Sequence, residues 1–131
     1  MKGPMVWIID DDMVAQFAAT YKIGQSCPDH RVLCHDSIEG ALTAIGECMN
    51  GKDRIPDIVL LDLSFPMLDG WHFLQALEKN GKAVAAIEVF ILSTFSNAKD
   101  RVRAKGHPLV KGHFDKPISW ANLSSVFGAD P

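Results

Sequence analysis

The sequence has few of the features that mark secreted, membrane or nucleic-acid-binding proteins. Its three cysteines are odd in number and follow no disulfide pattern, which predicts reduced thiols in the cytoplasm. No apolar run approaches the roughly 20 residues that cross a bilayer, and the N-terminus has no signal-peptide pattern. The formal net charge of −3 gives no general attraction to nucleic acids or acidic membranes. These absences predict a soluble cytoplasmic protein that binds neither a membrane nor nucleic acid.

A zinc site is a weak alternative in one segment of the chain. Cys27, His30, Cys34 and His35 are potential ligands, but their spacing does not match the paired Cys-x₂-Cys patterns of zinc proteins. The segment is better interpreted as a turn followed by a strand.

The composition is typical of one globular domain. The chain has 131 residues, of which 47% are hydrophobic and 22% are charged. This length allows a substantial core without disulfides or metals. We therefore expect a single domain over residues 1–131, with no second domain.

Strand and helix patterns alternate along the whole chain. Apolar runs predict strands at residues 5–9, 31–34, 57–61, 89–92 and 113–114. Helices are predicted over residues 13–26, 38–49, 70–80, 97–105 and 120–127. Such alternation is typical of an α/β fold with a parallel sheet. The third strand is apolar without alternation, which predicts that helices cover both faces of the sheet.

The helices carry recognisable start signals and apolar faces. Apolar side chains recur at helical spacing in the first predicted helix and indicate an amphipathic segment. They are Met13, Val14, Phe17, Ala18 and Tyr21. Asp12 is expected to cap this helix, Asp36 or Ser37 the second, and Ser119 the fifth. Residues 50–56, between the second helix and the third strand, are predicted to form a surface loop.

Polar side chains suited to phosphoryl chemistry follow four of the five predicted strands. The carboxyl ends of parallel strands lie along one edge of the sheet, where ligands bind in open α/β folds. We therefore expect three carboxylates, a hydroxyl and an ammonium to meet in one cleft. The residues are Asp10, Asp11, Asp62, Ser93 and Lys116.

This combination of groups has a specific chemical use. Hard carboxylate oxygens suit Mg²⁺. Three neighbouring carboxylates would raise one another's pKa values unless a cation lay among them, and Mg²⁺ and Lys116 are the available cations. A carboxylate held beside both cations, with the Ser93 hydroxyl, can attack a phosphoryl group and become an aspartyl phosphate. Helix capping alone would explain Asp12, but it is a poor explanation for Asp10, Asp11 and Asp62 together.

Four motifs, each placed after a predicted strand, resemble those of one known family. They are Val-Trp-Ile-Ile-Asp-Asp-Asp at 6–12, Leu-Leu-Asp-Leu-Ser-Phe-Pro-Met-Leu-Asp-Gly at 60–70, Ile-Leu-Ser-Thr at 91–94 and Asp-Lys-Pro-Ile at 115–118. Over essentially its whole length, the chain resembles the receiver domain of two-component response regulators. The resemblance implies a flavodoxin-like, doubly wound five-stranded parallel sheet with strand order 2-1-3-4-5 and helices on both faces.

The resemblance also implies a metal site and a phosphorylated residue. Asp62 would be the phosphorylated residue and would contact Mg²⁺. Asp11 would be a direct metal ligand, and Asp10 a ligand through water. The backbone carbonyl of Ser64 would complete the protein's share of the metal shell.

The implied phosphate-binding and switch positions show two departures from the family pattern. Ser93 and Lys116 would bind the phosphoryl oxygens. Thr94 stands where the family usually has Ala or Gly. His113 stands where an aromatic switch residue is expected, so it is either the switch residue or a partly exposed histidine without that role.

The resemblance implies a signalling role rather than turnover of a substrate. A sensor histidine kinase or a histidine phosphotransfer protein would phosphorylate Asp62, and the fourth helix, fifth strand and fifth helix would then present a changed surface to an unknown downstream protein. No output domain is expected, and the only chemistry expected is self-phosphorylation and self-dephosphorylation. The alternative is a Mg²⁺-dependent phosphatase or phosphotransferase with an aspartyl-phosphate intermediate. Such enzymes of the haloacid-dehalogenase type carry a second Asp two residues after the nucleophile, where this chain has Ser64.

Two further features lie outside these motifs. Trp71 is interpreted as a packing residue at the start of the third helix. The fourth helix carries a positive run that is interpreted as a solvated face, because no aromatic residue interleaves with the charges as in nucleic-acid-binding segments. The run consists of Lys99, Arg101, Arg103 and Lys105.

Overall fold

The structure, a computed structural model, describes residues 3–94 and 98–127. Its strands are β1 (Met5–Ile9), β2 (Arg31–His35), β3 (Ile58–Leu61), β4 (Glu88–Ser93) and β5 (Val110–Asp115). Its α-helices are α1 (Met13–Ser26), α2 (Ile38–Met49), α3 (Gly70–Lys79), α4 (Ala98–Gly106) and α5 (Trp120–Phe127). A short 3₁₀ helix, η1 (Gly81–Val84), follows α3.

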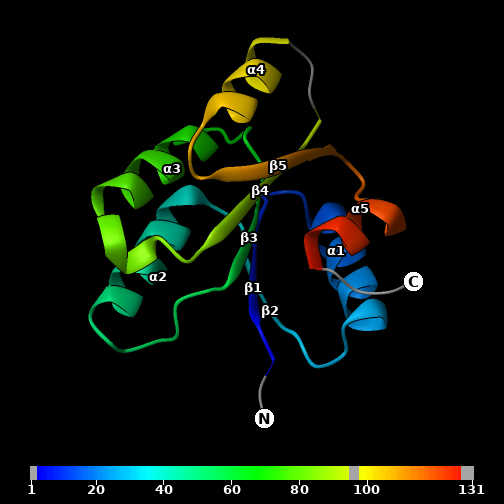
Figure 1. Cartoon of the computed structure of the whole chain (residues 1–131), viewed down its shortest axis with the longest axis horizontal. Coiled ribbons are helices and arrows are strands. Elements are labelled where there is room, and N and C mark those ends of the chain that lie inside the picture. The colour runs from blue at the N-terminus through cyan, green and yellow to red at the C-terminus, as the bar shows by residue number, and fades with distance from the viewer. Residues whose placement is uncertain (1–2, 95–97, 128–131) are drawn as a thin grey trace.

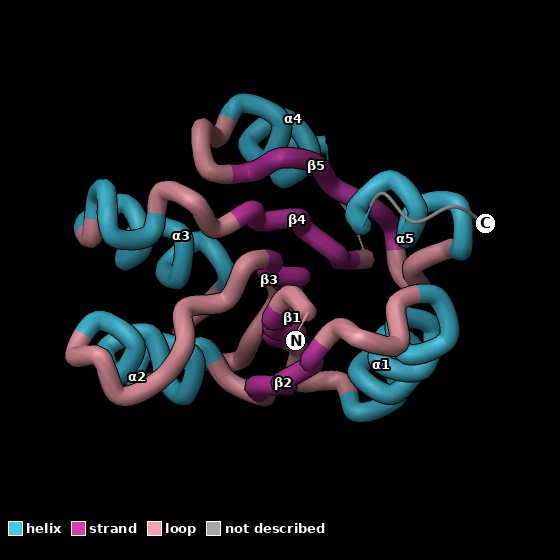
Figure 2. Tube along the Cα trace, turned by 60° about the horizontal axis from the view of Figure 1, so that its bottom comes forward, coloured by secondary structure: helices cyan, strands magenta, loops and turns pink. Residues whose placement is uncertain are grey.

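The strands form one parallel sheet in the order β2-β1-β3-β4-β5, which confirms the predicted fold and strand order. Helices α1 and α5 cover one face, and α2 and α3 cover the other (Figure 1). Helix α4 lies beside β5, at the edge of the sheet (Figure 2). All four residues of β3 are buried, as expected for a central strand covered on both faces.

Two hydrophobic clusters hold the layers together, one on each face of the sheet. Alternate residues of β1 point to opposite faces, so Val6 and Ile8 pack towards α1 and α5, while Trp7 and Ile9 pack towards α2 and α3. The central strands are therefore fixed on both sides by side chains that are almost completely buried. This packing sets the position of the loops that follow each strand.

Helix α1 is present as predicted, but its large apolar side chains face solvent. Asp12 caps the helix by accepting hydrogen bonds from two first-turn amides. The side chains of Met13, Val14, Phe17 and Tyr21 are 56–77% exposed. The helix instead buries the smaller Ala19 together with Ile23 against the sheet. The apolar spacing therefore predicted the helix correctly, but it did not identify the face that the helix buries.

Most predicted helix ends are confirmed, and strand β5 begins three residues earlier than expected. Ser37, rather than Asp36, caps α2, and the Ser119 hydroxyl accepts from an amide in the first turn of α5. Strand β5 begins at Val110 rather than His113. Lys111 and Gly112 have low strand propensity, which hid the start of this strand in the sequence.

The segment between α2 and β3 is a surface loop, as predicted. Residues 51–54 are exposed, and Gly51 adopts a φ of 77°, a conformation that favours glycine. The loop leads into the start of β3, at the end of the sheet opposite the predicted cleft. None of the helices in residues 3–94 and 98–127 is long and apolar enough to cross a bilayer.

Candidate functional site

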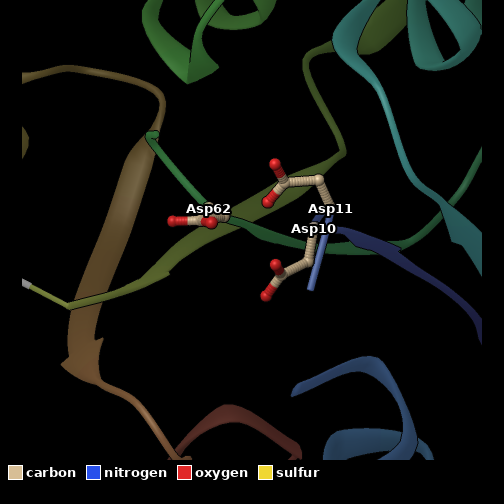
Figure 3. A group of neighbouring side chains, drawn as sticks. All are labelled: Asp10, Asp11 and Asp62. Atoms are coloured by element: carbon tan, nitrogen blue, oxygen red, sulfur yellow. The ribbon is translucent and has the colours of Figure 1, made fainter. Parts of the chain in front are cut away.

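Three aspartates gather where β1 and β3 end. One carboxylate oxygen from each of Asp10, Asp11 and Asp62 lies within 4.8 Å of the others, and Figure 3 shows the three side chains as one group. Asp10 and Asp62 are 2% and 5% exposed, whereas Asp11 is open to solvent. Within the described residues, no other set of three or more His, Cys, Asp or Glu side chains could share an ion, so the zinc alternative gains no support.

The Asp62 carboxylate is held in place by hydrogen bonds to both of its oxygens. Oδ1 accepts from the Ser93 hydroxyl at 2.9 Å, from the Leu63 amide at 2.8 Å and from the Ser64 amide at 3.4 Å. Oδ2 accepts from Lys116 Nζ at 3.1 Å. Ser93 is itself buried, at 3% exposure. The side chain is therefore preorganised, with a charge-assisted hydrogen bond from Lys116 to Oδ2 and three neutral donors to Oδ1.

Lys116 bridges the two buried aspartates. Its Nζ atom lies 2.7 Å from Asp10 Oδ2 and 3.1 Å from Asp62 Oδ2. Burial raises the pKa of Asp10, although the hydrogen bond from Lys116 opposes the shift. Burial alone would lower the pKa of Lys116, but the hydrogen bonds and charges of Asp10 and Asp62 outweigh it and leave that pKa raised. Lys116 therefore stays charged and partly neutralises the cluster.

The donor set fits a divalent cation of the hard type. With all three aspartates ionised, three negative charges and the one positive charge of Lys116 leave two negative charges. The oxygens are carboxylates, one of them solvent-exposed, which suits an ion that keeps several of its waters. Asp10, Asp11 and Asp62 thus match what Mg²⁺ requires. The role of the Ser64 carbonyl stays a prediction.

The loop between β3 and α3 packs tightly against the backbone of Asp62. The Gly70 amide donates to the Leu63 carbonyl at 3.0 Å. A β-carbon at Gly70 would lie 2.5 Å from the Asp62 carbonyl oxygen, so only glycine fits at this close approach. Asp69 then caps α3 by accepting from the Trp71 and His72 amides. The start of α3 therefore fixes the backbone beneath the Asp62 side chain.

The other predicted site residues lie around this centre, and their roles stay predictions. Thr94 follows Ser93 and is exposed. His113 is half-buried on β5, opposite Ile91 of β4. One contact was missed by the sequence reasoning: Gln16 Nε2 donates to the Asp10 backbone carbonyl at 2.6 Å. Nothing in the sequence distinguishes that glutamine from any other polar residue on a helix.

The family model of the response regulator receiver domain matches residues 6–127. A curated relative, the transcriptional regulatory protein PcoR of Escherichia coli, is 32% identical over 84 residues. This alignment covers 56% of the chain and 34% of PcoR, so the chain matches about a third of that protein's length.

Solved structures share the fold at low sequence identity. A two-component response regulator from Cytophaga hutchinsonii has a TM-score of 0.86 at 22% identity, covering 98% of this chain and 96% of that one. A two-component response regulator from Legionella pneumophila has a TM-score of 0.78 at 22% identity, covering 96% of both chains. The phosphorylated cyanobacterial phytochrome response regulator RcpA has a TM-score of 0.78 at 21% identity, covering 95% and 89%. The family match, the shared fold and the geometry of the site show that this chain belongs to the response regulator receiver domains of two-component systems.

Proposed function

We propose that Asp62 accepts a phosphoryl group from a histidine-phosphorylated donor protein, either a sensor histidine kinase or a phosphotransfer protein. The observation that carries this proposal is the environment of the Asp62 carboxylate. It lies between the Ser93 hydroxyl and the Lys116 ammonium, and beside two further carboxylates that can hold Mg²⁺. The family membership supports the same role.

The chemistry is one displacement at phosphorus. A carboxylate oxygen of Asp62 forms a bond to phosphorus as the bond from phosphorus to the donor's imidazole nitrogen breaks, and the nitrogen keeps the electron pair. Lys116 and the Ser93 hydroxyl bind oxygens of the transferred group, which stabilises its charge. Asp10, Asp11 and Asp62 would hold Mg²⁺, which when bound would supply positive charge that offsets repulsion between phosphoryl oxygens and carboxylates.

Incubation with acetyl phosphate and Mg²⁺ tests this function and separates it from the phosphatase alternative. We expect intact-protein mass spectrometry to find one alkali-labile phosphate per chain. We expect no turnover of a panel of sugar phosphates, because Ser64 stands where a second acidic group would protonate a leaving group. Rapid hydrolysis of the sugar phosphates would instead support the alternative that the protein is a phosphatase.

Magnesium should stabilise the folded chain through Asp11. A ligand that binds only the folded state at 100 times its dissociation constant adds about 2.7 kcal/mol, and we expect saturating Mg²⁺ to raise the melting temperature by several degrees. Asp11→Ala removes one ligand and should lose most of this shift. Asp36→Ala removes an exposed carboxylate near Asp11 and should keep it. A full shift in Asp11→Ala would remove Asp11 from the metal site.

We propose that the donor protein binds the outward face of α1, where the side chains of Met13, Val14, Phe17 and Tyr21 form an exposed apolar stripe. It begins at Met13, directly after the acidic residues, and the exposed part of this helix carries no charged side chain. Exposed apolar side chains in a contiguous stripe mark interaction sites. A partner that remained bound here would obstruct access to Asp62, so a transient partner that delivers the phosphoryl group fits this face best. Such a partner would present an apolar surface of its own.

A substitution in the middle of the apolar stripe of α1 should reduce phosphotransfer from a protein donor but not labelling by a small-molecule donor. Phe17→Asp places a charge in an apolar contact, and we expect phosphotransfer from a histidine phosphotransfer protein that labels the parent chain to fall at least about tenfold. Labelling by acetyl phosphate should not change. Gln25→Asp adds the same charge in the last turn of α1, roughly 12 Å further along the helix, and serves as the control. Equal loss with both donors would show that Phe17 acts on the pocket or the fold instead.

The output of the domain is proposed to pass through α4, β5 and α5. We propose that residues 1–131 form a single receiver domain and that phosphorylation changes this surface for a downstream protein. Amide hydrogen exchange of these elements, measured with and without phosphate on Asp62, tests the proposal.

A further inference from the structure

Helices α3 and α4 are joined by a small group of stacked and paired side chains. The guanidinium carbon of Arg103 lies 4.2 Å from the ring centroid of Trp71. The ring of His107, just beyond α4, lies 6.4 Å from the Trp71 ring, centroid to centroid. His107 Nε2 also pairs with Glu78 Oε1 at 2.7 Å. We name this group the Trp71 clamp; it consists of Trp71, Glu78, Arg103 and His107.

The geometry of His107 shows that the clamp is well defined. Its Nδ1 atom accepts from the Leu109 amide at 3.2 Å, so Nε2 carries the hydrogen that faces Glu78. Trp71 and Glu78 lie seven residues apart, about two turns, and therefore on the same face of α3. One side of α3 thus contacts Arg103 of α4 and His107, the residue that directly follows α4.

The clamp matters because α4 has little apolar anchorage of its own. Ala104 is the one fully buried apolar residue among residues 99–106, and the helix is otherwise mainly charged. The four residues of its positive run are exposed, as predicted for a solvated face, and Arg103 also stacks on Trp71. An arginine over a tryptophan ring contributes about 0.5–1 kcal/mol at an exposed site.

Trp71 directly follows Gly70, whose backbone packs against that of Asp62. Gly70 approaches the Asp62 carbonyl so closely that no β-carbon fits between them. A shift of the Asp62 loop must therefore move the start of α3, which includes Trp71. Trp71 also contacts Arg103 and His107 at the far end of α4 from Ser93. This connection runs through α3 and does not involve the hydrogen bond between Asp62 and Ser93 at the end of β4.

We propose that the Trp71 clamp couples the state of Asp62 to the position of α4. The inference rests on the proposed function, since it concerns what phosphorylation of Asp62 moves. The clamp is formed while Asp62 is a carboxylate paired with Lys116. It therefore stabilises that arrangement, and weakening it should favour the phosphorylated one. Two sites are coupled when both change the population of the same element, here α4.

The test measures binding of beryllofluoride with Mg²⁺, a stable mimic of an aspartyl phosphate, by ¹⁹F NMR titration of the whole chain. We expect Arg103→Ala to bind it about two- to fivefold more tightly than the parent, which corresponds to the energy of the lost stacking. Lys105→Ala removes the same charge from an exposed position on the same helix and should not change the affinity. In the Trp71→Leu background, Arg103→Ala should have no further effect.

The outcomes separate this inference from the proposed function. If the parent chain binds no beryllofluoride, the assignment of Asp62 fails. If the parent binds it and Arg103→Ala binds it equally or more weakly, only the clamp is overturned. An effect of Arg103→Ala that persists unchanged in Trp71→Leu would also overturn the clamp, because the coupling would not pass through the ring. Arg103 is exposed, so its variant is expected to fold, and a melting curve of each variant verifies this.

Discussion

Asp62→Asn should reduce labelling by acetyl phosphate to background while leaving the fold intact. An amide oxygen is a poor nucleophile, so the substitution removes the reaction rather than slowing it. The side chain keeps its shape, and its oxygen can still accept from the Ser93 hydroxyl and the Leu63 amide. The hydrogen bond from Lys116 is lost, because an amide NH₂ group replaces Oδ2 and cannot accept from Nζ. Mass spectrometry of the variant after incubation with acetyl phosphate and Mg²⁺ measures the effect.

The control for this experiment makes the same change at an aspartate of the same edge. The control is Asp36→Asn. Asp36 is exposed, directly follows β2 and lies near Asp11, but it is not one of the three clustered aspartates. This variant should be labelled as the parent is. A phosphate that persists in Asp62→Asn and maps to Asp10 or Asp11 would show that the acceptor has been assigned to the wrong carboxylate.

Gly70→Ala should be the most destabilising single-methyl addition near the site. The new β-carbon would lie 2.5 Å from the Asp62 carbonyl oxygen and 3.0 Å from the Leu63 α-carbon. Both are backbone atoms, so they cannot move aside as a side chain could. Overpacking of this kind lowers the free energy of unfolding by about 1–3 kcal/mol. We also expect slower labelling by acetyl phosphate, because the displaced backbone carries Asp62.

Gly46→Ala is the matched control for this substitution. Gly46 lies within α2, and a β-carbon there would meet nothing within 4 Å outside its own helix. Alanine in a helix interior is about 0.5–1 kcal/mol more favourable than glycine, so this variant should be more stable than the parent. Urea unfolding of both variants measures the two free energies. Similar values would show that the contact of Gly70 with Asp62 is not the cause.

The convergence of the site residues was predictable because the alternating strand and helix patterns indicate one parallel sheet, whereas the strand order came from the family resemblance. Apolar runs gave the strands, alternation with helices gave a parallel sheet, and a parallel sheet brings the residues after its strands to one edge. Asp10, Asp62 and Lys116 therefore meet although they come from three separate segments. No knowledge of side-chain packing was needed for that step.

Features that depend on packing between elements were not predictable in the same way. Helix α1 has two apolar faces, and hydrophobicity alone favours the larger residues such as Phe17, whereas the sheet accepts the smaller Ala19 with Ile23. The contact between Trp71 and Arg103 joins residues 32 positions apart, and no local pattern relates them. The sequence identifies which residues are chemically able to act, but not which surface each helix buries.

The loop between α2 and β3 has a practical consequence for measuring these effects. Residues 51–53 project from the end of the sheet that lies away from the aspartates. A fluorophore or a short affinity tag attached there would be remote from the incoming phosphate and from the α4 surface. The domain thus offers an attachment point at which a reporter can follow signalling without taking part in it.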